Sequence, residues 1–225
     1  MGGMGRSFDG SYAEYVLVPA KNVFTVSSTL PWPLLAAVPE TWFTVYSAMQ
    51  GSLQLGRGET ILIRGATSAA GIAAIQIAKS LGCRVIATTR SRDKRSFLEE
   101  RGADMAILDD GDLEAGVFAR YPEGVEKVLE LVGPATLLGS MRLLKYHGIA
   151  CSVGILGKQF TLDGFDPIKD IPDGRYLCSF YSNYPTQDRI DRIFAHIEAN
   201  GITPYVSKSL KFEDIAVAHG IMEAN

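Results

Sequence analysis

The sequence predicts an α/β fold: a Rossmann-type, doubly wound parallel sheet with helices on both faces. Segments of strand and helix character alternate from residue 60 to residue 182, and their connections are short. In Thr60–Arg64, Ile61, Leu62 and Ile63 also form a continuous apolar run, typical of a buried parallel strand, and small residues then lead into a helix. Both observations favour the same fold class.

The elements follow in chain order. Ser11–Pro19 is predicted to be a strand that ends at a proline, and Val23–Val26 a second short extended segment. Pro31–Met49 has helical character, interrupted by Pro33 and Pro39. The further strands expected are Thr60–Arg64, Arg84–Thr88, Asp104–Leu108, Val125–Val132, Ile149–Val153 and Arg175–Ser182, with a turn at Tyr146–Gly148. The further helices expected are Ala70–Leu81, Asp93–Arg101, Asp112–Arg120, Ala135–Lys145, Thr186–Asn200 and Phe212–Ala224.

Composition narrows the class of protein. The 225 residues are 47% hydrophobic and 21% charged, with a net charge of −3, which gives no support to a nucleic-acid or membrane-surface partner. The cysteines, Cys83, Cys151 and Cys178, form no C-x-x-C motif, and their strand positions predict core residues. No signal-peptide pattern or membrane-length apolar run occurs in the sequence, and a reducing cytoplasm fits best.

The turn after Thr60–Arg64 predicts a site for a pyrophosphate. The dinucleotide fingerprint G-x-G-x-x-G appears here as Ala66-Thr-Ser68-Ala-Ala-Gly71, preceded by Gly65, so only its third glycine is kept. Alanine and serine are small enough for close backbone approach, and the following helix directs its N-terminal N–H groups and dipole at one point. The alternative is that Gly71 only lets the helix pack on the strand.

The loop after the second strand favours NADPH over NADH. NAD sites place a carboxylate at this position to bind the ribose hydroxyls. This chain instead has Thr89, Arg90 and Ser91, with Lys94 one helical turn later. Two cations and two hydroxyls can bind a 2′-phosphate, and each charged hydrogen bond contributes about 1.5–3 kcal/mol. The alternative is a solvated basic surface loop.

Other nucleotide-binding classes fit less well. The P-loop needs G-x-x-x-x-G-K-[ST], and the region of Gly71 has no such lysine. Short-chain dehydrogenases use a Tyr-x-x-x-Lys pair, which none of the tyrosines forms. Methyltransferases usually carry an acid after the second strand, where this chain is basic.

A series of segments resembles the medium-chain dehydrogenase/reductase superfamily, and within it the zinc-free quinone oxidoreductases. These segments are Gly10–Pro19, Leu35–Tyr46, Leu55–Ala66, Ala73–Gly82, Gly102–Asp104 and Ala218–Asn225. The resemblance implies residues 1–43 as a remnant of a GroES-like catalytic domain with its linking helix, 44–183 as the NADP-binding domain, and 184–225 as a return to the catalytic domain. We therefore expect a fragment that lacks most of the catalytic domain and the last strand.

The resemblance also implies the site residues. The pyrophosphate turn matches Gly65, Ser68, Ala69, Ala70, Gly71 and Ile72, and the 2′-phosphate loop matches Thr89, Arg90, Ser91 and Lys94. The adenosine side matches Val132 and Gly133, and the nicotinamide side matches Gly154 and Ile155. Thr44 and Tyr46 lie where the linking helix of the family faces the nicotinamide, although Tyr46 is equally well explained as a core aromatic residue.

The resemblance points to a zinc-free enzyme. Glu40 stands near the family's third zinc ligand, and no cluster of four cysteines occurs. His147, His196 and His219 are isolated in the sequence, so we expect surface or packing roles for them and no metal site.

The expected function is NADPH-dependent hydride transfer to a quinone or an α,β-unsaturated carbonyl, with Tyr46 as the one named catalytic candidate. One alternative is a zinc-type alcohol dehydrogenase, and another is a non-catalytic NADPH-binding module. Family members often dimerise through the edge strand near Arg175–Ser182, whose apolar residues are consistent with a homodimer, although a covered edge in a monomer explains them too.

Overall fold

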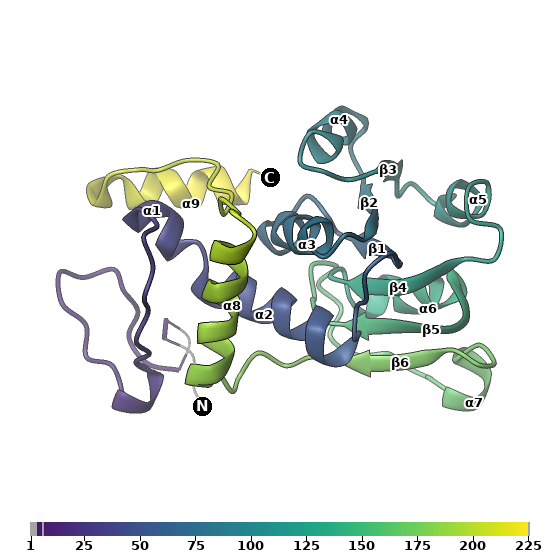
Figure 1. The fold of residues 1–225 in the computed structure, drawn as a ribbon, viewed down its shortest axis with the longest axis horizontal. Helices are drawn as coiled ribbons and strands as arrows, with labels where there is room; N and C mark the ends of the chain where they lie inside the picture. Colours follow the sequence, from purple (N-terminus) through teal and green to yellow (C-terminus); the bar gives the residue numbers. More distant parts are fainter. Residues whose placement is uncertain (1–3, 6, 225) are drawn as a thin grey trace.

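The computed structural model describes residues 4–5 and 7–224 and confirms the predicted fold class. Six parallel strands lie in the order β3-β2-β1-β4-β5-β6, with the edge strands at opposite ends of the sheet (Figure 1). The strands are β1 Thr60–Arg64, β2 Arg84–Thr89, β3 Met105–Leu108, β4 Val125–Glu130, β5 Leu144–Ser152 and β6 Tyr176–Ser179. The order reverses between β1 and β4, which is where such folds bind their ligands.

Some of the helices cover the two faces of the sheet, and others, such as the last one, lie away from it (Figure 1). The helices of the described residues are α1 Trp32–Ala36, α2 Pro39–Ser47, α3 Ala69–Ser80, α4 Arg95–Glu99, α5 Leu113–Phe118, α6 Pro134–Arg142, α7 Pro167–Asp170, α8 Gln187–Ala199 and α9 Ile215–Glu223, with the short helices η1 Ala20–Asn22, η2 Ala48–Ser52, η3 Arg92–Lys94 and η4 Phe212–Asp214. Ile61 and Ile63 of β1 face a core shared with α2, α3 and α8, whereas Leu62 faces a core shared with α5 and α6. This alternation is the two-residue period of a strand buried on both faces.

The helix α8 joins the sheet domain to the last part of the chain. Its apolar stripe (Ile190, Ile193, Phe194 and Ile197) is buried in the same core as α2 and α3. That core therefore includes residues after 183, the boundary that the family resemblance implies for the cofactor domain. Residues 1–3, 6 and 225, which belong to the predicted segments 1–43 and 184–225, lie outside the described residues.

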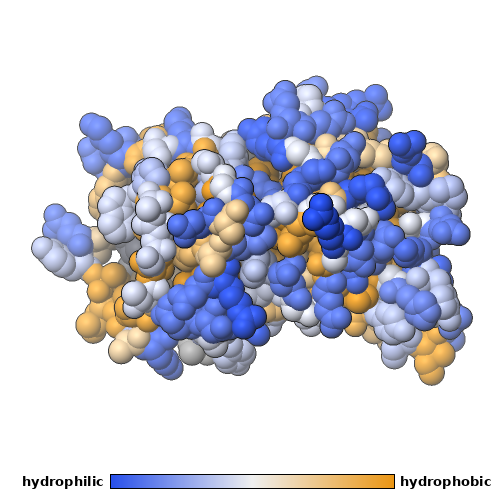
Figure 2. Space-filling view, viewed as in Figure 1, coloured by the Kyte–Doolittle hydropathy of each residue, from blue (hydrophilic) through white to orange (hydrophobic). Residues whose placement is uncertain are grey.

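The predicted strand Ser11–Pro19 is wrong, and Val23–Val26 forms no strand either. A strand needs a neighbour for its N–H and C=O groups, and neither segment is paired with another in the described part of the chain. The side chains that a sheet would cover are at the surface: Leu17 is 94% exposed and Val23 65%. Figure 2 accordingly shows apolar residues at the surface over this end of the molecule.

The predicted turn Tyr146–Gly148 lies inside β5, which begins five residues before the expected start, at Leu144. Between the pairs Val125↔Leu144 and Lys127↔Ile149 the register shifts, and His147 has a φ of +64°. These residues form an irregularity within a continuous strand, so the prediction of a separate turn before the strand was wrong.

No helix in the described part of the chain is long and apolar enough to cross a membrane.

Candidate functional site

The turn between β1 and α3 has the geometry that the sequence predicts. Gly65 has a φ of +82°, which a side chain would strain, and its N–H donates to the Thr88 hydroxyl at 3.2 Å. Ser68 is the N-cap of α3: its hydroxyl accepts from the Gly71 N–H at 3.0 Å and donates to the Gly65 carbonyl at 2.9 Å. The N–H groups of Ala69 and Ala70, the first two residues of α3, have no partner inside the helix, so they are available to an anion.

Gly71 is required by packing. A Cβ atom built there would lie 2.5 Å from the Cα, carbonyl carbon and carbonyl oxygen of Ala66, a distance that real Cβ contacts essentially never show. The first turn of α3 therefore packs directly on the backbone of the turn. This contact explains why the third glycine of the fingerprint is kept, and it is compatible with both a structural and a cofactor-binding role.

The ends of β4 and β5 lie beside this turn. Gly133 has a φ of +99°, and a Cβ there would lie 2.5 Å from the Gly154 carbonyl oxygen. A Cβ on Gly65 would lie 3.3 Å from Val132 and 3.2 Å from Leu156. The structure thus brings together three predicted parts of the site, from β1, β4 and β5, and adds Leu156, which sequence reasoning missed.

A buried polar network supports these strand ends. Arg64 holds Asp109, at the end of β3, through bonds of 2.6 and 2.8 Å, and donates to the Ser140 hydroxyl at 3.1 Å. The Ser140 hydroxyl donates in turn to the fully buried carboxylate of Glu130. Glu130 accepts the N–H groups of Val132 at 2.8 Å and of Gly133 at 3.0 Å, so it fixes the loop on the adenosine side.

Burial raises the pKa of Glu130 above its ordinary value, although its hydrogen bonds and the charge of Arg64 oppose the shift. Sequence reasoning missed the network. Its one visible signal is a charged residue at the end of each of two buried strands, Arg64 in β1 and Glu130 in β4.

The loop after β2 presents its cations to solvent. Arg90 and Lys94 are exposed, and within the described residues neither forms an ion pair. Thr89 is instead buried, and its hydroxyl accepts from the Ser91 N–H at 3.1 Å and donates to the Ser91 carbonyl at 3.3 Å. The Thr89 hydroxyl therefore shapes the loop, while the two cations remain available to a ligand.

The two predicted residues of α2 have different surroundings. The Thr44 hydroxyl donates to Glu40 Oε1 at 3.2 Å, and the same oxygen accepts from Ser182, which follows β6, at 3.4 Å. The ring of Tyr46 lies 5.2 Å from the ring of His196 on α8. Thr44 is thus near the exit of β6, whereas none of the polar or ring contacts of the described residues joins Tyr46 to the glycine turns.

The His196 Nε2 atom is 2.8 Å from the Ser80 hydroxyl of α3. Burial raises the pKa of the Tyr46 hydroxyl, opposed by the charge of Arg192, and burial lowers the pKa of His196. His196 therefore packs between helices, in agreement with the role expected for it.

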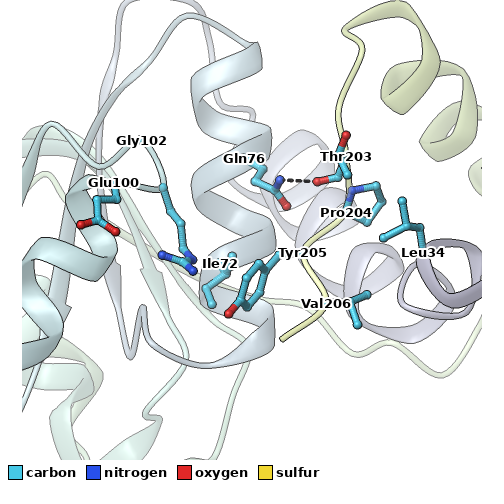
Figure 3. Close-up of a pocket in the computed structure, with 10 residues that line it drawn as sticks. Leu34, Ile72, Gln76, Glu100, Gly102, Thr203, Pro204, Tyr205 and Val206 are labelled. Carbon is cyan, nitrogen blue, oxygen red and sulfur yellow. Dashed lines mark hydrogen bonds between the residues drawn. The ribbon is translucent and has the colours of Figure 1, made fainter. Parts of the chain in front are cut away.

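A pocket of about 590 Å³ lies along the outer side of α3 (Figure 3). It is formed by Ile72 and Gln76 of α3, the chain that follows α4, and the segment containing Thr203 and Tyr205. Gln76 Nε2 donates to the Thr203 carbonyl at 2.7 Å and closes one side. Of the predicted site residues only Ile72 lines this pocket, so it is separate from the glycine turns.

A zinc ion in a protein needs several His, Cys, Asp or Glu ligands. Among the residues that the structure describes, no group of three or more such side chains is arranged to hold a metal ion. Glu40 belongs to no such group, and its carboxylate accepts hydrogen bonds from Thr44 and Ser182, so the described residues do not fit a zinc ion.

Comparison with known proteins identifies the family of this chain. A family model described as "Zinc-binding dehydrogenase" matches residues 69–190, more than half of the chain. The chain belongs to this family. The match confirms the resemblance to the medium-chain dehydrogenase/reductase superfamily and to its quinone oxidoreductase-like members.

Two curated relatives illustrate the family. Prostaglandin reductase-3 of Bos taurus is 32% identical over 161 residues, which are 71% of this chain and 42% of that protein. Quinone oxidoreductase of Homo sapiens is 26% identical over 219 residues, 95% of this chain and 65% of that protein. The chain therefore spans about two fifths to two thirds of the length of these relatives.

Solved structures have the same fold. AibC superposes with a TM-score of 0.85 at 29% identity, over 98% of this chain and 61% of that one. Mycobacterial Rv1454c, complexed with NADPH, superposes with a TM-score of 0.82 at 23% identity, over 96% of this chain and 69% of that one. At this identity the second comparison supports the fold alone.

Proposed function

We propose that this chain is the cofactor-binding part of an NADPH-dependent oxidoreductase that transfers hydride to a quinone or an α,β-unsaturated carbonyl. The observation that carries the proposal is the convergence of three strand ends beside the N-terminus of α3. A Cβ at Gly133 would lie 2.5 Å from the Gly154 carbonyl oxygen, and a Cβ at Gly65 would lie 3.2–3.3 Å from the side chains of the loops after β4 and β5. Such a surface fits a pyrophosphate and its flanking riboses.

The 2′-phosphate preference is supported by the charges around the loop after β2. Arg90 and Lys94 are exposed and unpaired among the described residues. Asp109 lies next to this loop, because its N–H donates to the Thr89 carbonyl at 2.7 Å. Arg64 binds the Asp109 carboxylate in a bidentate ion pair. The guanidinium compensates the negative charge of this carboxylate, which would otherwise repel a phosphate.

In this proposal NADPH, when bound, supplies the hydride, and the protein supplies binding and orientation. Ser68, Ala69, Ala70, Gly71 and Ile72 present the first turn of α3 to the pyrophosphate. Val132 and Gly133, fixed by the buried carboxylate beneath them, hold the adenosine side, while Gly154 and Ile155 hold the nicotinamide side.

At the reacting end, hydride addition develops negative charge on the substrate oxygen, which a hydroxyl or backbone N–H group can stabilise. We propose Thr44 beside the nicotinamide and retain Tyr46 as the candidate hydroxyl. For Tyr46 to act, its ring must face the substrate as well as His196.

Two further proposals concern the oligomeric state and the cellular compartment of the protein. The edge strand β6 is the proposed contact of a homodimer, because Tyr176 within it and Tyr181 after it are 51% and 72% exposed. A reducing cytoplasm is the proposed compartment.

The test is NADPH oxidation by a protein that contains this chain together with the part of its relatives' length that the chain does not span. A simple quinone and a simple enone serve as acceptors, and bound metal is measured on the same sample. Turnover without stoichiometric zinc supports the proposal. Zinc at one equivalent with alcohol oxidation favours the alcohol dehydrogenase alternative, and NADPH binding without turnover favours a non-catalytic module.

A further inference from the structure

Two of the three cysteines are paired on adjacent strands of the sheet. Cys151 of β5 and Cys178 of β6 are direct register partners in a parallel pair, so their side chains leave the same face. Neighbouring strands lie about 4.8 Å apart, and disulfides join Cα atoms about 4.4–6.8 Å apart. The backbone spacing at this pair is therefore one that a disulfide can bridge.

The two thiols differ in access. Cys151 is fully buried and Cys178 is partly exposed. Cys178 Sγ lies 3.4 Å from the Ala150 carbonyl oxygen and 3.6 Å from the Ser52 carbonyl oxygen at the end of η2. An oxidant from solvent therefore reaches Cys178 first, with Cys151 directly behind it.

The electrostatics divide the pair in the same way. The neighbouring Cys151 thiol and the charge of Lys127 lower the pKa of Cys178, and burial opposes them. The neighbouring Cys178 thiol, together with burial, raises the pKa of Cys151. A partly exposed thiol of lowered pKa directly beside a second, buried thiol is the arrangement of an attacking and a resolving cysteine.

We propose that Cys178 and Cys151 form a peroxide-sensitive thiol pair, a role separate from the proposed oxidoreductase site. The Cys178 thiolate attacks one oxygen of hydrogen peroxide, the O–O bond breaks, and Cys178 sulfenic acid and hydroxide form. The Cys151 sulfur then attacks the Cys178 sulfur, its proton passes to the leaving oxygen, and water departs. In sum, two thiols and one peroxide give one disulfide and two waters.

The position of the pair gives oxidation a structural consequence. β6 is an edge strand, and β5 is its one strand neighbour among the described residues, so it can move toward β5 as the bond forms. Ser179, the next residue, accepts a hydrogen bond from the Ser52 hydroxyl at 3.2 Å, and Cys151 precedes Gly154 by three residues. A shift at the pair is therefore transmitted to η2 and to the loop on the proposed nicotinamide side.

The experiment treats the reduced chain with hydrogen peroxide, without nucleotide, and maps its peptides by mass spectrometry under non-reducing conditions. We expect a Cys151–Cys178 peptide pair that has lost two hydrogen atoms, and a fall in free thiols from three to one that dithiothreitol reverses. Cys83 is the internal control, because it is buried elsewhere and its thiol donates to the Gly56 carbonyl at 3.2 Å.

Two variants test the order of the steps. Cys151→Ser should leave a sulfenic acid on Cys178 that dimedone traps, and Cys178→Ser should leave Cys151 unmodified. Three free thiols after peroxide treatment, or oxidation of Cys83 at the same rate as Cys178, would overturn the proposal. If a variant fails to fold by circular dichroism, the wild-type peptide map alone decides. Because no nucleotide is present, failure here is distinct from failure of the proposed function.

Discussion

The substitution Gly71→Ala tests the close packing of α3 on the turn. The added Cβ would lie 2.5 Å from three backbone atoms of Ala66, whereas ordinary contacts begin near 3.4 Å. The helix start must therefore move by roughly 0.9 Å, the difference between these distances. Overpacking of this kind typically costs about 1–3 kcal/mol. In a chain of this size that corresponds to a fall in Tm of about 2–12 °C.

The assay is thermal unfolding with and without NADPH. We expect Gly71→Ala to lower Tm and to lose the stabilisation that NADPH gives the wild type, because the N–H groups of the first turn move with the helix. Gly220→Ala is the matched control: it lies inside α9 with no atom within 4 Å of the added Cβ, and alanine should raise stability by about 0.5–1 kcal/mol. A Gly71→Ala protein with wild-type Tm and NADPH response would refute the reasoning.

Three further substitutions test the buried groups. Asp109→Ala leaves the charge of Arg64 uncompensated in a pair whose side chains are 13% and 10% exposed; urea unfolding should show a loss of about 3 kcal/mol, and an unchanged midpoint would contradict this. Because burial raises the pKa of Glu130 above 4.5, wild-type stability should fall as pH rises from about 4.5 through the folded-state pKa. Glu130→Gln should remove that part of the slope, and an identical slope would exclude Glu130 as its source. Burial lowers the pKa of His196 below 6.5, so stability should fall as pH drops from about 6.5 through the folded-state pKa. His196→Gln should flatten this decline in denaturant unfolding at a series of pH values, and an undiminished decline would show that other groups cause it.

The sequence predicts those features that local patterns determine. The bounds of β1 match residue for residue, because an apolar run followed by small residues specifies both ends of a buried strand. The alternation of strands and helices determines the parallel sheet, and the turn at Gly65 and Ser68 follows from residues a few positions apart.

The features that the sequence does not reveal depend on distant partners. Ser11–Pro19 has the composition of a strand, but pairing requires a neighbour that the described residues do not provide. Arg64 bonds to Asp109 and Ser140 across 45 and 76 residues, so no local pattern reports the network. The irregularity in β5 arises from its register with β4, which is also a tertiary property.

The measurement that tests the central claim most directly is a titration of this chain with NADPH and with NADH, repeated for Arg90→Ala and Lys94→Ala. Arg120→Ala, which removes an exposed cation after α5, is the control. The account predicts that NADPH binds at least about tenfold more tightly than NADH and that each loop substitution removes much of this difference, while the control keeps it. Equal affinities in the wild type, or no binding of either nucleotide, would contradict the account.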